Sequence, residues 1–175
     1  MTRSPAPSWP PESSTGCWPE RFEEHMAGIG CPMCANDFDA EDIGWGILVR
    51  RGQVANAYLW RSGQVRGYCV LIYRGGHVAE PTQLAETEAA AFRYDTLALG
   101  GAIEAHYQPM KINYLTLGNK IPHLHSHVFP RRMAGADPAP GGPLPFTVLD
   151  EGRQDEEQLQ RDAARLRLFL AGPAT

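Results

Sequence analysis

The stretch "HLHSHVF", residues 123–129, places three histidines at alternate positions and decides how the rest of the chain is interpreted. Successive side chains of a β-strand point to opposite faces, so a strand here would turn His123, His125 and His127 to one face. The whole chain contains six histidines, and these three are half of them. Buried imidazoles each need a hydrogen-bond partner, and an apolar core offers few. The pattern therefore indicates a functional cluster rather than three structural residues.

Two kinds of chemistry fit this cluster. Three imidazoles can bind a metal ion, or they can act on phosphate groups. Imidazole is neutral and nucleophilic near pH 7, can become cationic beside a phosphate, and is a good leaving group. A neighbouring histidine can contact phosphate oxygens or carry the proton. The spacing alone leaves both a three-histidine metal enzyme and histidine-based phosphate chemistry open.

The sequence around the cluster predicts an α+β domain with a mainly antiparallel sheet. Apolar residues at steps of three and four predict helices over residues 86–107 and 155–170, and "RFEEHM" indicates a short helix. A hairpin turn at Ser62–Gly63 would join two strands, because glycine readily adopts positive φ. The expected strands lie within residues 44–52, 56–74, 111–118 and 123–131.

The two ends of the chain differ in composition from its centre. Residues 1–20 are rich in proline and serine and predict a disordered or draped arm, whereas residues 21–175 are expected to form one domain with a C-terminal helical extension. The arm lacks the apolar middle of a signal peptide, and no apolar run approaches the ~20 residues that span a bilayer. We therefore expect a cytoplasmic protein without a membrane partner. The formal net charge of −4 argues against a nucleic-acid partner.

Several ordered motifs give the chain a resemblance to a known family. "HLHSHVF" resembles the His-φ-His-φ-His-φ-φ signature (φ apolar) of the histidine triad (HIT) superfamily, with Ser126 in place of one apolar residue. "VLIYRGGH", ending at His77, and "NYLTLGNKIPHLHSHVFPR" resemble its other strands and loops. "CPMC" resembles the cysteine pair near the start of many bacterial members. The resemblance covers roughly residues 30–133 and leaves the first residues and the C-terminal helix outside.

The resemblance implies both a fold and an activity. The fold would be a HIT-like antiparallel sheet of about five strands with a central helix and a C-terminal helix, in a protein that forms homodimers. The activity would be that of a nucleotide phosphohydrolase or nucleotidyl transferase, which cleaves a phosphoanhydride or phosphoramidate at the α-phosphate through a covalent nucleotidyl-histidine. As a hydrolase, the protein would act on nucleoside phosphoramidates, dinucleoside polyphosphates or another small phosphorylated molecule.

The resemblance also implies roles for individual residues. His125, the middle histidine, would be the nucleophile, and His127 would contact the bridging or α-phosphate oxygens. Asn113 and Asn119 occupy positions where members place polar side chains around the phosphate. Lys120 stands where some members carry a serine near the leaving group. The sequence therefore departs from the family pattern at this position, and the resemblance does not identify the acid that protonates the leaving group.

A second departure concerns the nucleoside. Many members hold the sugar hydroxyls with an acidic residue in a region that reads "LWRSGQVRGY" here, and this stretch contains no acid. Tyr68 stands about where a histidine often lies. One alternative function is therefore a non-catalytic nucleotide-binding or sensor module. Another is a nucleotide-sugar uridylyltransferase-like transferase, although those relatives are longer and typically have glutamine at the position of His127.

The cysteine pair Cys31 and Cys34 forms a C-x-x-C motif with more than one possible meaning. A redox pair usually opens a helix after a strand in a βαβ unit, which this sequence does not predict, and an unmetallated structural pair is a further alternative. A zinc site needs two more ligands. The resemblance to zinc-bearing HIT proteins implies that His77 and His123 supply them, ahead of His25, in a closed structural site.

Overall fold

The computed structural model describes residues 17–36, 39–133, 135–149 and 151–171. Of the predicted arm, residues 1–16 lie outside the described residues. No helix in the described ranges has the length and apolar character needed to cross a membrane.

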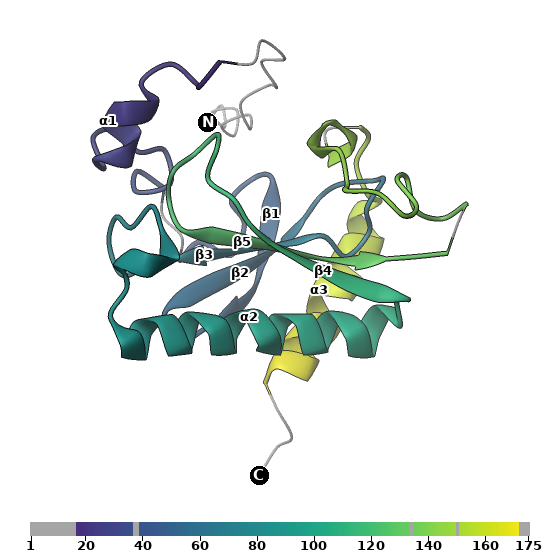
Figure 1. Cartoon of the computed structure of the whole chain (residues 1–175). Coiled ribbons are helices and arrows are strands. Elements are labelled where there is room, and N and C mark those ends of the chain that lie inside the picture. Colours follow the sequence, from purple (N-terminus) through teal and green to yellow (C-terminus); the bar gives the residue numbers. More distant parts are fainter. Residues whose placement is uncertain (1–16, 37–38, 134, 150, 172–175) are drawn as a thin grey trace, which may run out of the picture.

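One antiparallel sheet organises the chain (Figure 1). Its five strands stand in the order β1-β2-β3-β5-β4, and every neighbouring pair is antiparallel. This confirms the α+β class and the expected sheet of about five strands. The strands are β1 (Gly46–Arg51), β2 (Ala55–Trp60), β3 (Cys69–Tyr73), β4 (Lys111–Thr116) and β5 (His125–Arg131).

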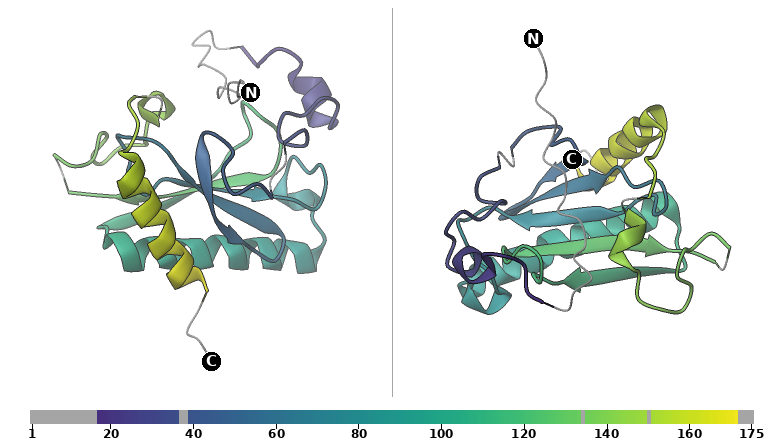
Figure 2. Two further views of the ribbon diagram at one scale, coloured as in Figure 1. Left: turned by 180° about the vertical axis from the view of Figure 1, so that it is seen from behind. Right: turned by 90° about the horizontal axis from the view of Figure 1, so that it is seen from above.

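One face of the sheet is covered by the two long helices, α2 (Glu86–Tyr107) and α3 (Glu156–Leu170) (Figure 2). The first helix has the predicted bounds, and the second begins one residue later than predicted. Asp155 caps the second helix, because its carboxylate accepts a hydrogen bond of 3.0 Å from the backbone N–H of Gln158. The apolar stripes of both helices pack on Cys69, Leu71 and Val128, which form the helix-side core of the sheet.

The opposite face of the sheet carries a second buried cluster and the motif histidines. Tyr58, Tyr68, Val70, Ile72 and Phe129 are among its members. Two segments cover this face: the N-terminal segment with α1 (Phe22–Met26), and residues 135–149, which include the short turn η2 (Phe146–Leu149). Figure 1 shows both on the side away from α2. Since β3 lies in the middle of the sheet with both faces covered, all its residues are buried.

The connection between β2 and β3 differs from the prediction. The two strands are joined by residues 61–68 instead of a tight turn at Ser62–Gly63, because Ser62 forms an isolated bridge with Arg153. The left-handed residue of this connection is Gly67, with φ of 93°. A Cβ atom there would lie 2.7 Å from the Tyr107 ring, so only glycine fits.

Candidate active site and metal centre

His125 and His127 lie side by side on β5, on the face away from the helices. In the ladder they pair with Ile72 and Val70 of β3. Their ring centroids are 4.9 Å apart and the rings are nearly perpendicular, at 78°. His123 precedes the strand, so only two of the three motif histidines share the strand face that the sequence predicted for all three. All three are at most 3% exposed.

The backbone fixes the proton position of His125. Its Nδ1 lies 2.6 Å from the carbonyl oxygen of His123, and a carbonyl can only accept, so Nδ1 carries the hydrogen. Burial lowers the pKa of His125 to about 4, although the bond to His123 acts against this shift. The ring is therefore neutral at pH 7, and Nε2 keeps a lone pair.

His127 is held by a side chain instead. Its Nδ1 lies 2.8 Å from the hydroxyl oxygen of Tyr68. Burial, reinforced by the neighbouring His125, lowers the pKa of His127 to about 3. The strand therefore presents two adjacent neutral imidazoles, each anchored through Nδ1.

A cavity of about 170 Å³ opens beside His125. The loop between β4 and β5 supplies most of its wall, and η2 closes it on the other side. Asn119 and Lys120 thus line the same cavity as His125. The remaining lining residues are Leu117, Gly118, Ile121 and Phe146.

Asn113 does not line this cavity. Its Oδ1 accepts a hydrogen bond of 2.8 Å from the Arg131 guanidinium, which also contacts Asp137 at 2.7 Å. This hydrogen bond to Arg131, followed by the amides of Ala139 and Arg132, lowers the pKa of Asp137 to about 2, although burial opposes the shift. The structure therefore places Asn113 in a charged network next to the 135–149 segment.

Sequence reasoning missed the residue that covers the histidines. The Phe146 ring packs edge-on against His127, with 5.1 Å between ring centroids. Leu144 and Leu149, on either side of it, are buried in the same cluster. The composition of residues 134–145 indicated only a loop, and no motif marked the aromatic residue that follows it.

The stretch that lacks an acid carries two arginines, and both are paired with acids from other segments. Arg61 contacts Asp42 at 2.7 Å and also Glu156. Arg66 makes two hydrogen bonds of 2.7 Å to the carboxylate of Asp162. These cations stabilise loop connections.

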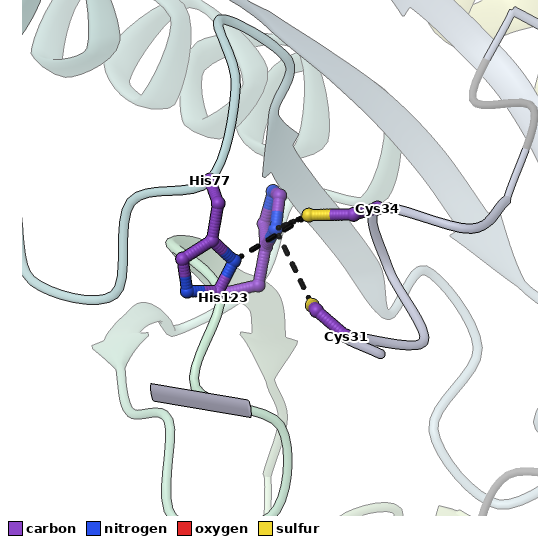
Figure 3. Close-up of side chains that lie close together, drawn as sticks. All are labelled: Cys31, Cys34, His77 and His123. Atoms are coloured by element: carbon purple, nitrogen blue, oxygen red, sulfur yellow. Dashed lines mark hydrogen bonds between the residues drawn. The ribbon is translucent and has the colours of Figure 1, made fainter. Parts of the chain in front are cut away.

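Four side chains that could bind a metal ion gather near the start of β5, on the face of the sheet away from the helices. Cys31, Cys34, His77 and His123 each contribute one ligand atom, and these atoms lie within 4.8 Å of one another. Cys34 Sγ lies 3.4 Å from Nδ1 of His77 and 3.4 Å from Nδ1 of His123, and Cys31 Sγ lies 3.8 Å from Nδ1 of His123 (Figure 3). Tetrahedral zinc with bonds of ~2.3 Å to sulfur and ~2.05 Å to nitrogen separates its ligand atoms by about 3.3 to 3.8 Å. These separations fit that geometry.

The proton positions of the two imidazoles also fit a metal. Nε2 of His123 lies 2.8 Å from the carbonyl oxygen of Tyr73, and Nε2 of His77 lies 3.2 Å from that of Met26. Each Nε2 therefore donates to a carbonyl, and each Nδ1 directs a lone pair at the sulfurs. Metal-ligating histidines are commonly oriented in this way by a carbonyl on the second nitrogen.

The two cysteines titrate as a pair. Burial opposes ionisation of Cys31, but its hydrogen bonding with His123 and with nearby backbone groups outweighs burial and lowers the pKa of Cys31 to about 6. Burial and the neighbouring Cys31 raise the pKa of Cys34 to about 11. Without a cation only one thiolate is stable here, whereas a bound metal would stabilise both. His25, the alternative ligand, is not a member of this group.

Comparisons with known proteins agree with this architecture. The family model described as "HIT domain" matches residues 52–134. A histidine triad protein from Bradyrhizobium japonicum superposes with a TM-score of 0.66 at 21% identity, covering 72% of this chain and 91% of that one. Another from Marinobacter aquaeolei gives 0.62 at 23% identity, covering 74% and 92%. No curated protein matches the chain.

A third solved structure has the same fold. A zinc-bound histidine triad family protein from Mycobacterium smegmatis superposes with a TM-score of 0.53 at 19% identity, covering 84% of this chain and 95% of that one. The family model, the strand order and the motif histidines agree with one another. Residues 52–134 match the HIT domain model, and the chain has the fold of histidine triad proteins.

Proposed function

We propose that the protein is a nucleotide phosphohydrolase or nucleotidyl transferase of the histidine triad type, with His125 as the nucleophile. The observation that carries this proposal is the hydrogen bond of 2.6 Å from Nδ1 of His125 to the backbone carbonyl of His123. The imidazole is then neutral, and its Nε2 carries a lone pair beside a cavity lined by Asn119 and Lys120.

In the first step, Nε2 of His125 attacks the α-phosphorus. A phosphorus–nitrogen bond forms while the bond from phosphorus to the leaving oxygen or nitrogen breaks, and the leaving group departs with the bonding electron pair and a proton from Lys120. The ring becomes cationic, and the His123 carbonyl stabilises it through the N–H it already accepts. Because the ring starts neutral inside a buried site, no proton has to leave it before attack.

In the second step, water attacks the same phosphorus. The phosphorus–nitrogen bond breaks, its electron pair returns to Nε2 of His125, and the water proton passes to the medium. The products are a nucleoside monophosphate and the neutral imidazole. Transfer to another acceptor replaces water by that acceptor in the same step.

The polar residues of the loop act on the phosphate and the leaving group. Lys120 lines the cavity beside His125 and supplies a cation where the leaving group departs. Asn119 offers amide contacts from the same loop, and His127 contacts the phosphate oxygens. Asn113 lies outside the cavity and acts on the site only through Arg131, which donates to its Oδ1.

The substrate is a small nucleotide or a related phosphorylated molecule. The buried histidine pair and the cationic loop support the phosphate part of this assignment. The nucleoside part rests on the match to the HIT domain model, because the stretch from Leu59 to Tyr68 has no acid and its arginines are ion-paired.

The cysteine–histidine group holds a structural zinc ion. Four protein ligands close a tetrahedral site, so the ion supplies no reactive position and instead ties the N-terminal segment to the start of β5. The fit of Cys31, Cys34, His77 and His123 supports this, as does the zinc-bound relative from Mycobacterium smegmatis.

The protein works in the cytoplasm as a homodimer. Strand β4 is at the edge of the sheet, and its backbone is open to pairing with a second copy. Tyr114 on this strand and Tyr94 and Leu97 on α2 are large, exposed side chains that a partner would cover. Light scattering coupled to size exclusion measures the mass in solution, and a monomer at micromolar concentration would contradict the assignment.

Intact-protein mass spectrometry after exposure to a panel of nucleotides tests the proposed chemistry. The wild type should gain the mass of one nucleotidyl group during turnover, and His125→Ala should not. His25→Ala is the matched control, because His25 lies on α1 outside the site, and it should gain the adduct. A wild type that hydrolyses nucleotides without an adduct on His125, even after rapid acid quenching, would contradict the mechanism.

A non-catalytic nucleotide-binding module is the second candidate. It is favoured by the burial of His125 and His127 beneath Phe146, which restricts access to the nucleophile. Nucleotide binding by calorimetry with neither adduct nor turnover would support this candidate over the hydrolase. A uridylyltransferase-like role is disfavoured, because His127 stands where those relatives typically have glutamine.

A further inference from the structure

The Tyr68 hydroxyl is buried against His127, the one acceptor that it contacts in the part of the chain that the structure describes. Tyr68 is fully buried, and its oxygen lies 2.8 Å from Nδ1 of His127. Within the described residues this is the one hydrogen bond of that side chain. The phenol directly precedes β3, so it enters the site from the centre of the sheet.

The phenol ring is held on both sides. It stacks on Phe129 with centroids 4.8 Å apart and planes at 14°, and it meets the edge of Trp60 at 5.9 Å. Its backbone N–H donates to Val65, and its carbonyl accepts from Trp60. The position of the hydroxyl is therefore set by packing and backbone pairing before any ligand binds.

The protonation of the two side chains determines which of them donates this hydrogen bond. Burial raises the pKa of Tyr68 well above its usual value, so the phenol keeps its hydrogen. If Nδ1 of His127 donated, that hydroxyl hydrogen would be buried without an acceptor, which is unfavourable. The favoured arrangement has the hydroxyl donating to Nδ1, which places the imidazole hydrogen on Nε2.

We propose that Tyr68 is the positioning residue of His127: its hydroxyl fixes the tautomer that presents Nε2–H to the phosphate. Nε2 has no hydrogen-bond partner among the described residues, and its ring adjoins that of His125. An N–H donor there binds a phosphoryl oxygen on which negative charge grows during attack by His125. This role rests on the proposed function, whereas the tautomer itself does not.

The tautomer is measured by NMR of ¹⁵N-histidine-labelled full-length protein. Two-bond correlations from the ring carbons' hydrogens distinguish a protonated Nε2 from a protonated Nδ1, and His127→Gln identifies the signals by removing them. The wild type should show Nε2–H for His127, and Tyr68→Phe should shift it to Nδ1–H or to a mixture. A wild-type Nδ1–H tautomer, or no change in Tyr68→Phe, overturns the proposal.

Tyr58→Phe is the matched control. Tyr58 is also a fully buried phenol on the same face, but its hydroxyl donates to the carbonyl of Ala40 at 3.2 Å. Removing that oxygen deletes a comparable bond without touching the histidines. It should leave the His127 signals unchanged.

Hydrolysis of a nucleoside 5′-phosphoramidate tests whether the Tyr68 hydroxyl supports catalysis through His127. Tyr68→Phe should lower kcat about tenfold with little change in KM, because the donor matters most in the transition state. In the His127→Ala background, which leaves Tyr68 no side chain to hold, the same substitution should have no further effect. An equal loss in both backgrounds would indicate general damage and overturn the role. A correct tautomer without nucleotidyl adduct or turnover would instead overturn the proposed function.

Discussion

His123 and His125 are two residues apart in one motif, yet the backbone prepares them for opposite tasks. His123 donates from Nε2 to the Tyr73 carbonyl at 2.8 Å, which leaves Nδ1 facing the cysteines. His125 donates from Nδ1 to the His123 carbonyl at 2.6 Å, which leaves Nε2 facing the cavity. In the proposed function, the nitrogen that the carbonyl occupies decides whether the histidine can serve as a metal ligand or as a nucleophile.

The largest expected effect separates these two histidines. His125→Ala should lower kcat by about 10⁴-fold or more, as removal of a covalent nucleophile does, while zinc content and melting temperature stay close to wild type. His123→Ala should instead lose zinc, with a smaller loss of hydrolysis, because the backbone carbonyl that holds His125 remains. Steady-state kinetics and elemental analysis of untagged protein measure both quantities. Zinc loss in His125→Ala would contradict the division of tasks.

Cys31→Ser tests whether the cysteine–histidine group binds zinc. Losing a zinc ion that is bound at about a thousand times its dissociation constant removes about 4 kcal/mol of stability. For a chain of this length the melting temperature should fall by about 10 °C. Cys17→Ser is the control, because Cys17 is an exposed free thiol outside the group. Stoichiometric zinc in Cys31→Ser, by elemental analysis, would exclude the proposed ligand set.

The sequence predicted most of the fold, because periodicity reports burial directly. The stripe of α2 and the capped start of α3 appear in the structure within one residue of their predicted bounds. The prediction of a tight turn after β2 was wrong, because a distant residue, Arg153, pairs with Ser62 and the connection is longer. Local propensity carries no information about such a partner.

The site was predictable where one residue type implies one chemistry. The C-x-x-C spacing left zinc as one of several possibilities, and the resemblance to zinc-bearing HIT proteins implied His77 and His123 as the other ligands; the structure brings the four ligand atoms within 4.8 Å of one another. The partner of His127 was not anticipated: Tyr68 was noted only as a departure from histidine. Phe146 was missed as well, since its contact with His127 depends on how a loop without periodicity folds back. Proton positions depend on such contacts and not on sequence spacing.

The chain contains two lysines, which allow a matched test of the cation at the cavity. Lys120 lines the cavity beside His125, whereas Lys111 donates to the carbonyl of Ile112 on the edge strand. Lys120→Met keeps the apolar stem and removes the cation. It should lower kcat/KM for a dinucleoside polyphosphate by about 10²-fold, the lower end for loss of an acid at the leaving group.

Lys111→Met is the matched control and should stay close to wild type. If Lys120→Met hydrolyses the polyphosphate at the wild-type rate, the cation has no role at the leaving group. The nucleophile assignment would survive that result, because it depends on the tautomer of His125 and not on the loop.

The smallest expected effect concerns His127, whose ring is held by a side chain rather than by a carbonyl. Its pKa falls from an unfolded value of about 6.5 to about 3 in the folded protein. Below pH 6.5 the unfolded chain therefore binds a proton that the folded protein excludes, and stability is lost as the pH falls toward 3. The slope is about 1.4 kcal/mol per pH unit, or about 2 kcal/mol by pH 5.

Urea unfolding of wild type and His127→Gln between pH 7 and 5 measures this loss. Glutamine does not titrate, yet its Oε1 can accept from Tyr68, so the variant should lose about 2 kcal/mol less than wild type over this range. Contributions from His125 and from the metal ligands are common to both proteins and cancel in the difference. Parallel stability curves would show that His127 is accessible to protons in the folded state, and the neutral, Tyr68-held imidazole would then be wrong.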